Sequence, residues 1–433
     1  MSIVEVTQGA LRGTSEDGLV VFRGVPYAAP PVGDLRWRTA QPHPGWSGVR
    51  EAAEYGPSAP QFHFPGVHPI LGNHGLPPFD EDCLTLNVWT PGVDDARRPV
   101  LVWIHGGGFL SGSGSLPVYA GDTFARNGDL VVVSINYRLG PLGFLHGVGD
   151  DDVWLSDQVA ALTWVRDNIA RFGGDPDNVT VAGQSGGALS IGALPGGLFH
   201  RAILQSAPLG LELPTASDAS ARTATLMDAL GVADVEALRK ESWQRLLEGT
   251  LAVMGRHQQW GEWALAFLPV LSRHPVDNLA ASSIPIVAGY TRDEATFAFG
   301  LDDTIRSATS AQVSSWASST GFSLSGDGTP GEQLQQAVCE AMFGAPLLDL
   351  ASRRPAWVYR FDVATPAHDG RLGATHCLDL PFTFANFGRW SHAPMMSGLD
   401  VSGLGDRMHR AWISFIRTGD PGWAPYPELH VFA

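Results

Sequence analysis

Short apolar runs and amphipathic segments alternate along most of this chain. Residues 100–104 and 130–135 are almost continuously apolar, which is typical of strands buried on both faces of a parallel sheet. Residues 84–89 alternate apolar and polar side chains, and therefore predict a half-buried strand. Further strands are expected at 178–182, 284–290 and 357–363.

Residues 155–172 predict a helix, because apolar side chains recur there every three or four positions, and Gly173-Gly174 should end it. Strands alternating with helices indicate an α/β fold, with a central, mostly parallel sheet between two layers of helices. The first 40 residues should form short strands and turns, and 56–80, rich in Pro, Gly and His, a long surface loop. Residues 212–265 predict a helical excursion.

Composition narrows the classes of function. The 433 residues carry 28 Lys and Arg against 44 Asp and Glu, a formal net charge of −16. Nucleic acids and anionic membranes require a basic surface, so neither is expected as a partner. No apolar run approaches the roughly 18 residues of a membrane span, and the first residues do not resemble a secretory leader. The three cysteines, Cys83, Cys339 and Cys377, are too few for a disulfide framework, so a cytoplasmic protein is expected.

A candidate nucleophile follows the strand expected at 178–182. The sequence there reads GQSGG at 183–187, a G-x-S-x-G pattern on a strand-to-helix turn, which exposes the hydroxyl of Ser185. The flanking residues must be glycine, because a Cβ at either position would collide with the neighbouring strand and helix. The preceding apolar strand makes this nucleophile elbow more specific than the bare pattern, whose alternative is an ordinary Gly/Ser turn.

A candidate oxyanion hole follows the strand expected at 100–104, where the sequence reads HGGGF at 105–109. Backbone N–H groups that converge on one point stabilise the negative oxygen of a tetrahedral intermediate, and only glycine brings the backbone close enough. The expected donors are Gly107, Gly108 and Gly186, the residue after the nucleophile. A phosphate-binding loop is a poor alternative because no lysine follows. His105 is expected to be structural.

The residues alone leave the base and the acid partly open. This order of motifs places an acid and then a histidine downstream of the serine. Asp293 and Glu294 follow the strand expected at 284–290, and only one of them can point at the histidine. His376 follows the strand expected at 357–363 and is the candidate general base among fourteen histidines.

The chain resembles the type-B carboxylesterases, the family of p-nitrobenzyl esterases and cholinesterases, nearly from end to end. The motifs that carry the resemblance are FRGVPYA at 22–28, PPVGDLR at 30–36, EDCLTLNVW at 81–89, NYRLG at 136–140, FGGDP at 172–176, LFHRAILQS at 198–206 and FIRTGDP at 415–421.

The resemblance implies an α/β-hydrolase fold over a single domain, 1–433, with no cofactor and no metal. It implies that Glu294 is the catalytic acid and that His376 is the catalytic histidine. It further implies that Arg36 and Glu81 form a structural ion pair. The expected partner is a small-molecule ester, and the protein is expected to be a monomer or a small homo-oligomer.

This sequence departs from the family pattern at several positions. Gln184 stands before the serine where the family usually has Glu, so a negative charge is missing and cationic, choline-like substrates are disfavoured. Gly186 replaces the usual Ala but keeps its N–H. Ala295 replaces a glycine after the acid. Cys83 lacks the upstream cysteine with which the family often pairs it.

Several weaker candidates surround this site. Phe109 and Gln184 are candidate substrate contacts because they adjoin the oxyanion loop and the nucleophile. The tryptophans of the excursion, Trp243, Trp260 and Trp263, are expected in its core more readily than in a pocket. The histidines of the 56–80 loop, His63, His68 and His74, are expected at the solvated rim because their spacing matches no standard zinc site. Cys377 is expected to be a small buried packing residue.

These observations predict a serine carboxylic ester hydrolase with a Ser-His-Glu triad and an acyl-enzyme intermediate. One alternative is a non-catalytic, cholinesterase-like binding module, which would not need Ser185, Glu294 and His376 together. Another is an acyltransferase that uses the same triad and differs only in what accepts the acyl group. The acyl and alcohol preference does not follow from the sequence.

Overall fold

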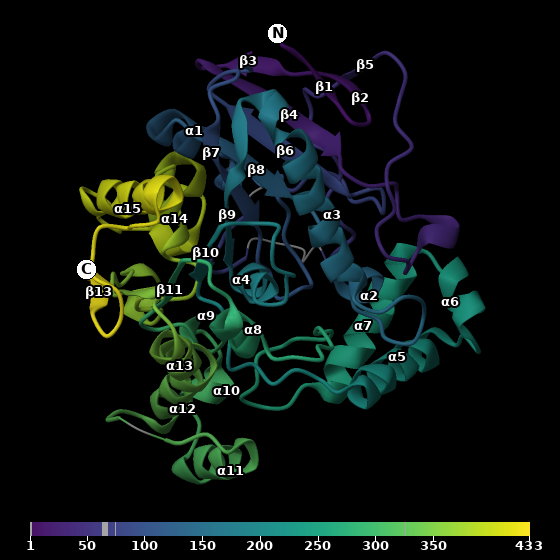
Figure 1. The fold of residues 1–433 in the computed structure, drawn as a ribbon. Coiled ribbons are helices and arrows are strands. Elements are labelled where there is room, and N and C mark those ends of the chain that lie inside the picture. Colours follow the sequence, from purple (N-terminus) through teal and green to yellow (C-terminus); the bar gives the residue numbers. More distant parts are fainter. Residues whose placement is uncertain (1, 63–67, 74, 325) are drawn as a thin grey trace.

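A ten-stranded sheet forms the centre of the computed structural model, which describes residues 2–62, 68–73, 75–324 and 326–433 (Figure 1). The strand order is β13-β12-β11-β10-β9-β7-β8-β6-β4-β3. In chain order these strands are β3 (Thr14–Glu16), β4 (Leu19–Pro26), β6 (Thr85–Thr90), β7 (Arg98–Ile104), β8 (Val131–Ile135), β9 (Gly174–Gln184), β10 (Arg201–Gln205), β11 (Ile286–Thr291), β12 (Trp357–Phe361) and β13 (Leu429–Phe432). A small second sheet holds β1 (Ile3–Val6), β2 (Gly9–Arg12) and β5 (Val49–Glu51).

Within the sheet, β8, β7, β9, β10, β11, β12 and β13 pair in parallel with their neighbours. On its other side β8 pairs antiparallel with β6, and antiparallel pairing continues through β4 to β3. This arrangement confirms the mixed, mostly parallel sheet and all six strands that the apolar runs predict. The runs predict neither β10 nor β13. β13 has four residues, of which only Phe432 is buried.

The prediction of a half-buried strand at 84–89 is wrong, because β6 is buried along its whole length. β6 lies inside the sheet between β4 and β8, and its polar side chains bond within the interior. Asn87 Oδ1 accepts from Gly24 N at 3.0 Å, its Nδ2 donates to Ser134 Oγ at 3.1 Å, and Thr90 Oγ1 donates to Phe172 O at 2.8 Å. Polar residues in this strand therefore indicate hydrogen-bond partners in the interior and not exposure to solvent.

Two helical layers cover the sheet, as Figure 1 shows. On one face lie α3 (Val153–Asn168), α4 (Gly186–Ile191), α8 (Pro275–Ala281) and α13 (Ala345–Arg353). On the other lie α1 (Asp122–Gly128), α14 (Leu380–Phe384) and α15 (Leu404–Thr418). Successive residues of a strand point to opposite faces of the sheet. Val102 therefore packs in the hydrophobic core on the α3 side, and Trp103 packs in the core on the α15 side.

The helix predicted over 155–172 is confirmed as α3, which continues as a 3₁₀ turn, Ile169–Phe172. Gly173 ends it with a φ of +75°, a left-handed conformation that glycine adopts without a Cβ penalty. Further helices outside the excursion at 212–265 are α2 (Gly140–Gly143), α9 (Thr296–Phe299), α10 (Asp303–Arg306), α11 (Ser310–Thr320) and α12 (Pro330–Cys339).

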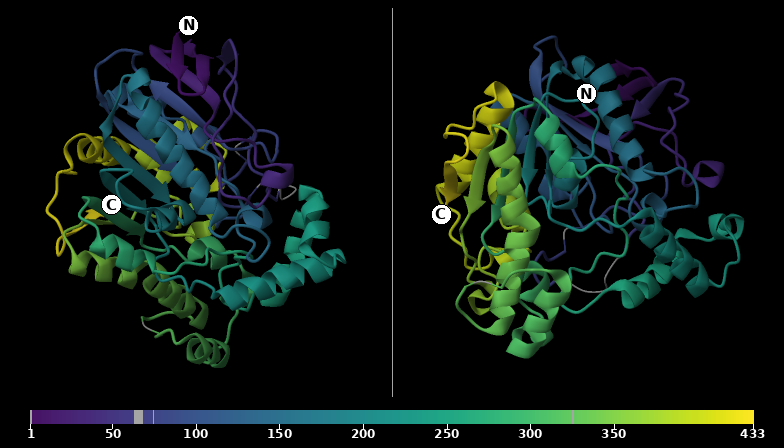
Figure 2. Two further views of the ribbon diagram at one scale, coloured as in Figure 1. Left: turned by 45° about the vertical axis from the view of Figure 1, so that its right-hand side comes forward. Right: turned by 60° about the horizontal axis from the view of Figure 1, so that its bottom comes forward.

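The excursion at 212–265 contains three helices, α5 (Ala216–Leu230), α6 (Val235–Lys240) and α7 (Trp243–His257). Both views in Figure 2 show them projecting beyond the central sheet. Arg36 joins them to the rest of the chain, because its Nη1 donates to Arg239 O at 2.8 Å and to Glu241 O at 2.6 Å. Its Nε donates to Glu81 Oε2 at 2.8 Å, which confirms the expected ion pair.

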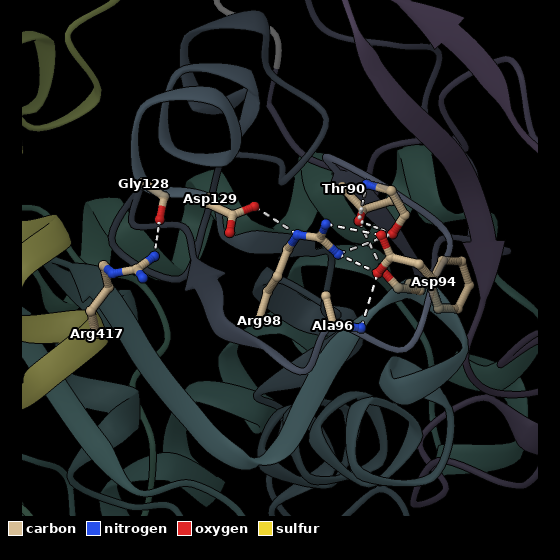
Figure 3. A network of polar contacts seen from close by, with 9 residues as sticks. Thr90, Asp94, Ala96, Arg98, Gly128, Asp129 and Arg417 are labelled. Atoms are coloured by element: carbon tan, nitrogen blue, oxygen red, sulfur yellow. Dashed lines mark hydrogen bonds and ion pairs between the residues drawn. The ribbon is translucent and has the colours of Figure 1, made fainter.

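A polar network holds the start of β7, at the end of the strand away from Ile104 (Figure 3). Arg98 binds Asp94 at 2.5 Å and Asp129 at 2.7 Å, and Arg417 of α15 donates to Gly128 O. The network ties the start of β7 to α1 and α15. The opposite, carboxyl edge of the parallel strands is where binding sites of open α/β sheets form.

Within the described residues, no helix is both long and apolar enough to cross a bilayer. Cys83, Cys339 and Cys377 are free thiols, and Cys83 and Cys377 are buried.

Candidate active site

Ser185 lies on the turn between β9 and α4, at the carboxyl edge of the sheet. Its φ of +56° and ψ of −124° are strained for a residue with a side chain. A Cβ on Gly187 would lie 2.2 Å from Ile104 O, and one on Gly183 would lie 2.7 Å from the carbonyl carbon of Gly187. Both glycines are thus required by close packing, as the sequence predicts, and Ser185 N donates to Gln205 O at 2.9 Å.

The 105–109 loop passes directly beside Ser185, since a Cβ on Gly106 would lie 3.1 Å from Ser185 Cβ. Gly107 and Gly108 have φ values of +110° and +60°. Among the described residues no acceptor pairs with the N–H of Gly107 or Gly108, and the N–H of Gly186, in the first turn of α4, lies where helices leave donors free.

Sequence reasoning missed the residue that supports this loop. The Gln61 side chain binds both backbone groups of Gly112: Nε2 donates to Gly112 O at 2.8 Å, and Gly112 N donates to Oε1 at 2.8 Å. His105 is structural, as predicted: it is buried, its ring stacks on Tyr137, and Nδ1 contacts Gly106 O at 2.8 Å. Burial lowers the pKa of His105 to about 4.

His376 Nδ1 donates to Glu294 Oε2 in the interior, where both side chains are buried. The second Glu294 oxygen, Oε1, accepts from Thr291 N at 2.8 Å, which fixes the carboxylate. The other acid, Asp293, points elsewhere: Oδ2 accepts from Ala374 N at 2.7 Å and pairs with Arg292. Glu294 therefore contacts His376 and Asp293 does not. Glu294 is also the acid that the resemblance implies, whereas the residues alone leave the choice open.

Burial opposes a charge on His376, but Cys377 and the carboxylate of Glu294 outweigh it, so the pKa of His376 is raised. A general base must be neutral. Activity that depends on neutral His376 should therefore fall as the pH drops, with an acid limb above the usual histidine range.

His376 Nε2, the atom that would receive a proton from Ser185, is bonded to another side chain. The amide nitrogen of Gln184 lies 2.8 Å from His376 Nε2 and 3.3 Å from Cys377 Sγ. Among the described residues no hydrogen bond joins Ser185 to His376. The structure therefore brings Ser185, His376 and Glu294 to one site, with Gln184 bonded to the histidine.

A cavity of about 430 Å³ opens over these groups. Its lining includes Ser185, His376 and the 106–112 loop, and otherwise consists largely of aliphatic, Met and aromatic side chains. Among the described residues of this lining there is no Asp, Glu, Lys or Arg. The rings of Trp263, Phe297 and Phe343 lie 5.3–5.6 Å from the His376 ring, centroid to centroid.

The weaker candidates from the sequence lie in different surroundings. Phe109 borders the cavity, but its ring is buried against Phe144 and Trp154. Trp263 lies in the lining, contrary to the expectation of a core position, because it follows the end of α7 on the coil that returns to the sheet. Trp243 packs on Phe79 instead.

Of the three histidines in the 56–80 loop, the structure describes His68. His63 and His74 lie outside the described residues. His68 borders the cavity, accepts from Leu71 N at 3.0 Å and stacks on Phe297. The described part of the chain contains no cluster of His, Cys, Asp and Glu that could hold a metal ion.

Two of the three rings beside His376 were not predicted from the sequence. Phe297 follows Glu294 by three residues, so the helical turn after the acid was a usable signal. Phe343 lies in a π-helical segment, Glu340–Gly344, which no sequence pattern indicates.

Comparisons with known proteins agree on one family. Residues 1–324 match the family model described as the carboxylesterase family. The chain is 55% identical to phenmedipham hydrolase of Pseudarthrobacter oxydans, over 99% of this chain and 92% of that protein. It is 35% identical to para-nitrobenzyl esterase of Bacillus subtilis, over 98% and 93%. A crystal structure of a Geobacillus stearothermophilus carboxylesterase superposes with a TM-score of 0.86 at 35% identity, covering 100% of this chain and 96% of that one.

Proposed function

The chain belongs to the carboxylesterase family and is a carboxylic ester hydrolase, and we propose that it works through a covalent acyl-enzyme on Ser185. One observation carries the proposal: the strained Ser185 lies beside a glycine loop in which the N–H groups of Gly107 and Gly108 have no acceptor among the described residues, in the same cavity as the buried His376–Glu294 pair. Nucleophile, oxyanion donors and base then share one reaction centre.

In the acylation step, Ser185 Oγ attacks the ester carbonyl and its proton passes to His376 Nε2. The N–H groups of Gly107, Gly108 and Gly186 stabilise the oxyanion. His376 then gives the proton to the alkoxide as the ester C–O bond breaks. Water attacks the acyl-enzyme in the same way and regenerates Ser185, while Glu294 holds the tautomer and stabilises the imidazolium.

Replacing the nucleophile tests this mechanism. Ser185→Ala should lower kcat/KM for p-nitrophenyl acetate by about 10⁴- to 10⁶-fold. A fluorophosphonate should label the native protein on the peptide that contains Ser185. Cys377→Ala is the matched control, because Cys377 lines the same cavity and its replacement should leave the label in place. Retention of most activity in Ser185→Ala would contradict the mechanism.

We further propose that the substrates are neutral esters with apolar or aromatic groups. The support is the cavity lining, whose described residues hold several rings and no charged Asp, Glu, Lys or Arg. A cation would lose water there without gaining a counter-charge. Initial hydrolysis rates on p-nitrophenyl esters of graded acyl length would measure the acyl preference. A bulky aryl ester and phenmedipham, for which the Pseudarthrobacter relative is named, would be compared with them.

A matched pair of alcohols tests the charge preference. Acetylcholine and 3,3-dimethylbutyl acetate have nearly the same shape and differ by one positive charge. The neutral ester should have the higher kcat/KM by several-fold or more. Equal or faster hydrolysis of acetylcholine would contradict the proposal.

A further inference from the structure

The Gln184 side chain occupies the one place on His376 that the reaction needs. Gln184 is 1% exposed and is the last residue of β9, which β10 and β7 flank. Its Nε2 lies 2.8 Å from His376 Nε2. Its backbone is therefore held by the sheet, and only its side chain can change partners.

The tautomer of neutral His376 follows from its other nitrogen. Glu294 accepts from Nδ1, so in the neutral ring this nitrogen carries the proton and Nε2 carries a lone pair. That lone pair accepts one strong hydrogen bond. In this structure an amide N–H of Gln184 fills it, and the hydroxyl of Ser185 must compete for the same lone pair.

One further contact orients the amide with its nitrogen toward the histidine. The same nitrogen donates to Cys377 Sγ at 3.3 Å. The oxygen end lies toward the 105–109 loop, where a Cβ on Gly106 would be 2.7 Å from Gln184 Oε1. Gly106 therefore leaves room for this side chain, in addition to shaping the loop.

We propose that Gln184 is a positioning residue that holds neutral His376 away from Ser185 in the resting enzyme and releases Nε2 when substrate enters. The inference rests on the proposed triad and goes beyond it. Gln184 exchanges no proton: the proton of Ser185 still passes to Nε2 and then to the alkoxide. When Nε2 carries that proton it can no longer accept, so the amide must turn or withdraw.

The surroundings of His376 contain few other charges. Glu294 and Cys377 contact it directly, and Asp379 lies three residues further along the chain and interacts with it electrostatically. The rings of Trp263, Phe297 and Phe343 flank it without charge, and His68 stacks on the far side of Phe297. A change at residue 184 should therefore appear in the titration of His376.

Two variants separate the charge of this side chain from its hydrogen bond. Gln184→Glu has nearly the same shape but faces Nε2 with a carboxylate, which favours the imidazolium. Gln184→Met has similar length and no strong donor. The pH dependence of kcat/KM for p-nitrophenyl acetate, and the downfield proton resonance of the His376 Nδ1–H, would be followed in each.

In Gln184→Glu the acid limb should move up by about one pH unit or more, as a neighbouring opposite charge does. In Gln184→Met the acid limb should move up less, because only a donor to the neutral form is lost. Competition for Nε2 also ends in Gln184→Met. Labelling of Ser185 by a small uncharged fluorophosphonate should therefore become several-fold faster on the high-pH plateau.

An acid limb unchanged in Gln184→Glu, or slower labelling in a folded Gln184→Met, would overturn the proposal. If Gln184→Glu does not fold, the labelling rate and resonance of Gln184→Met decide alone. Ser185→Ala distinguishes the levels: if it remains active, the triad fails. If it is inactive while both variants titrate and label like the native enzyme, only the role of Gln184 fails.

Discussion

At the scale of single residues, Asp379 stands out as a buried carboxyl group that pairs with no cation among the described residues. Its Oδ2 accepts from Gln205 Nε2 at 2.9 Å and from the Tyr359 hydroxyl at 3.0 Å, while Oδ1 has no hydrogen-bond partner. Burial raises the pKa of Asp379 from 3.8 to about 6. The charged form is therefore disfavoured close to His376.

This raised pKa makes stability depend on pH. The folded protein holds the Asp379 proton more tightly than the unfolded chain, so this stabilisation is complete below about pH 4 and is lost as the pH rises through about 6. Asp379→Asn cannot titrate. Its free energy of unfolding, relative to the native protein, should rise by on the order of 3 kcal/mol between pH 4 and 7.

Urea unfolding of both proteins at each pH measures this difference. Asp167→Asn, at an exposed position on α3, controls for the loss of one carboxylate. A relative stability that stays flat across this range would show that Asp379 does not titrate there.

At the scale of elements, the turn between β9 and α4 depends on close approach of α4 to β7. A Cβ on Gly187 would lie 2.2 Å from Ile104 O and 2.6 Å from His105 O. These atoms belong to the end of β7 and the start of the 105–109 loop. Space at Gly187 therefore sets the distance between Ser185 and the 105–109 loop.

Gly187→Ala should destabilise the fold by about 1–3 kcal/mol, because backbone atoms must move to admit the methyl group. It should also lower kcat more than tenfold, because the same movement displaces the 105–109 loop. Denaturant unfolding and p-nitrophenyl acetate kinetics measure the two effects.

Gly255→Ala in α7 is the matched control, since a Cβ there meets nothing within 4 Å. Its helix should gain about 0.5–1 kcal/mol, with activity unchanged. If Gly187→Ala behaved in the same way, the packing argument would be wrong.

The strands also show which features a local sequence pattern cannot predict. The apolar runs predict β7 and β8 because strands buried on both faces need apolar side chains on both. The same logic places β6 correctly but predicts the wrong burial for it, because the Asn87 side chain bonds to Gly24 and Ser134 in the interior. These partners lie 63 and 47 residues away in the sequence, so a local pattern cannot predict them.

At the scale of the whole molecule, Arg36 connects the helices α5–α7 to the rest of the chain. It binds Glu81 on one side and the carbonyl oxygens of Arg239 and Glu241 on the other, and the Arg36 and Glu81 side chains are each 11% exposed. α7 and the coil after it contribute Met254 and Trp263 to the cavity. Anchoring of the excursion therefore also supports the pocket.

Arg36→Met should lower the free energy of unfolding by about 2–4 kcal/mol, because it leaves the Glu81 carboxylate and two carbonyls without their donor. Proteolysis should cut faster around α6, within residues 231–242. Urea unfolding and timed digestion measure these changes. Arg166→Met, whose pair with Asp167 is exposed, should cost less than 1 kcal/mol. Equal effects in the two variants would refute this anchoring role.

The sequence by itself determined the α/β architecture, the serine elbow and the glycine loop. Each depends on local rules: strands buried on both faces are apolar, and tight turns between backbones require glycine. His376 and the choice of Glu294 needed the family resemblance, because they lie 191 and 109 residues from Ser185. Only the tertiary structure decided that the Gln184 amide contacts His376 Nε2 and that Trp263, Phe297 and Phe343 surround the His376 ring. These contacts join distant segments whose distances and directions are set by packing of the whole chain.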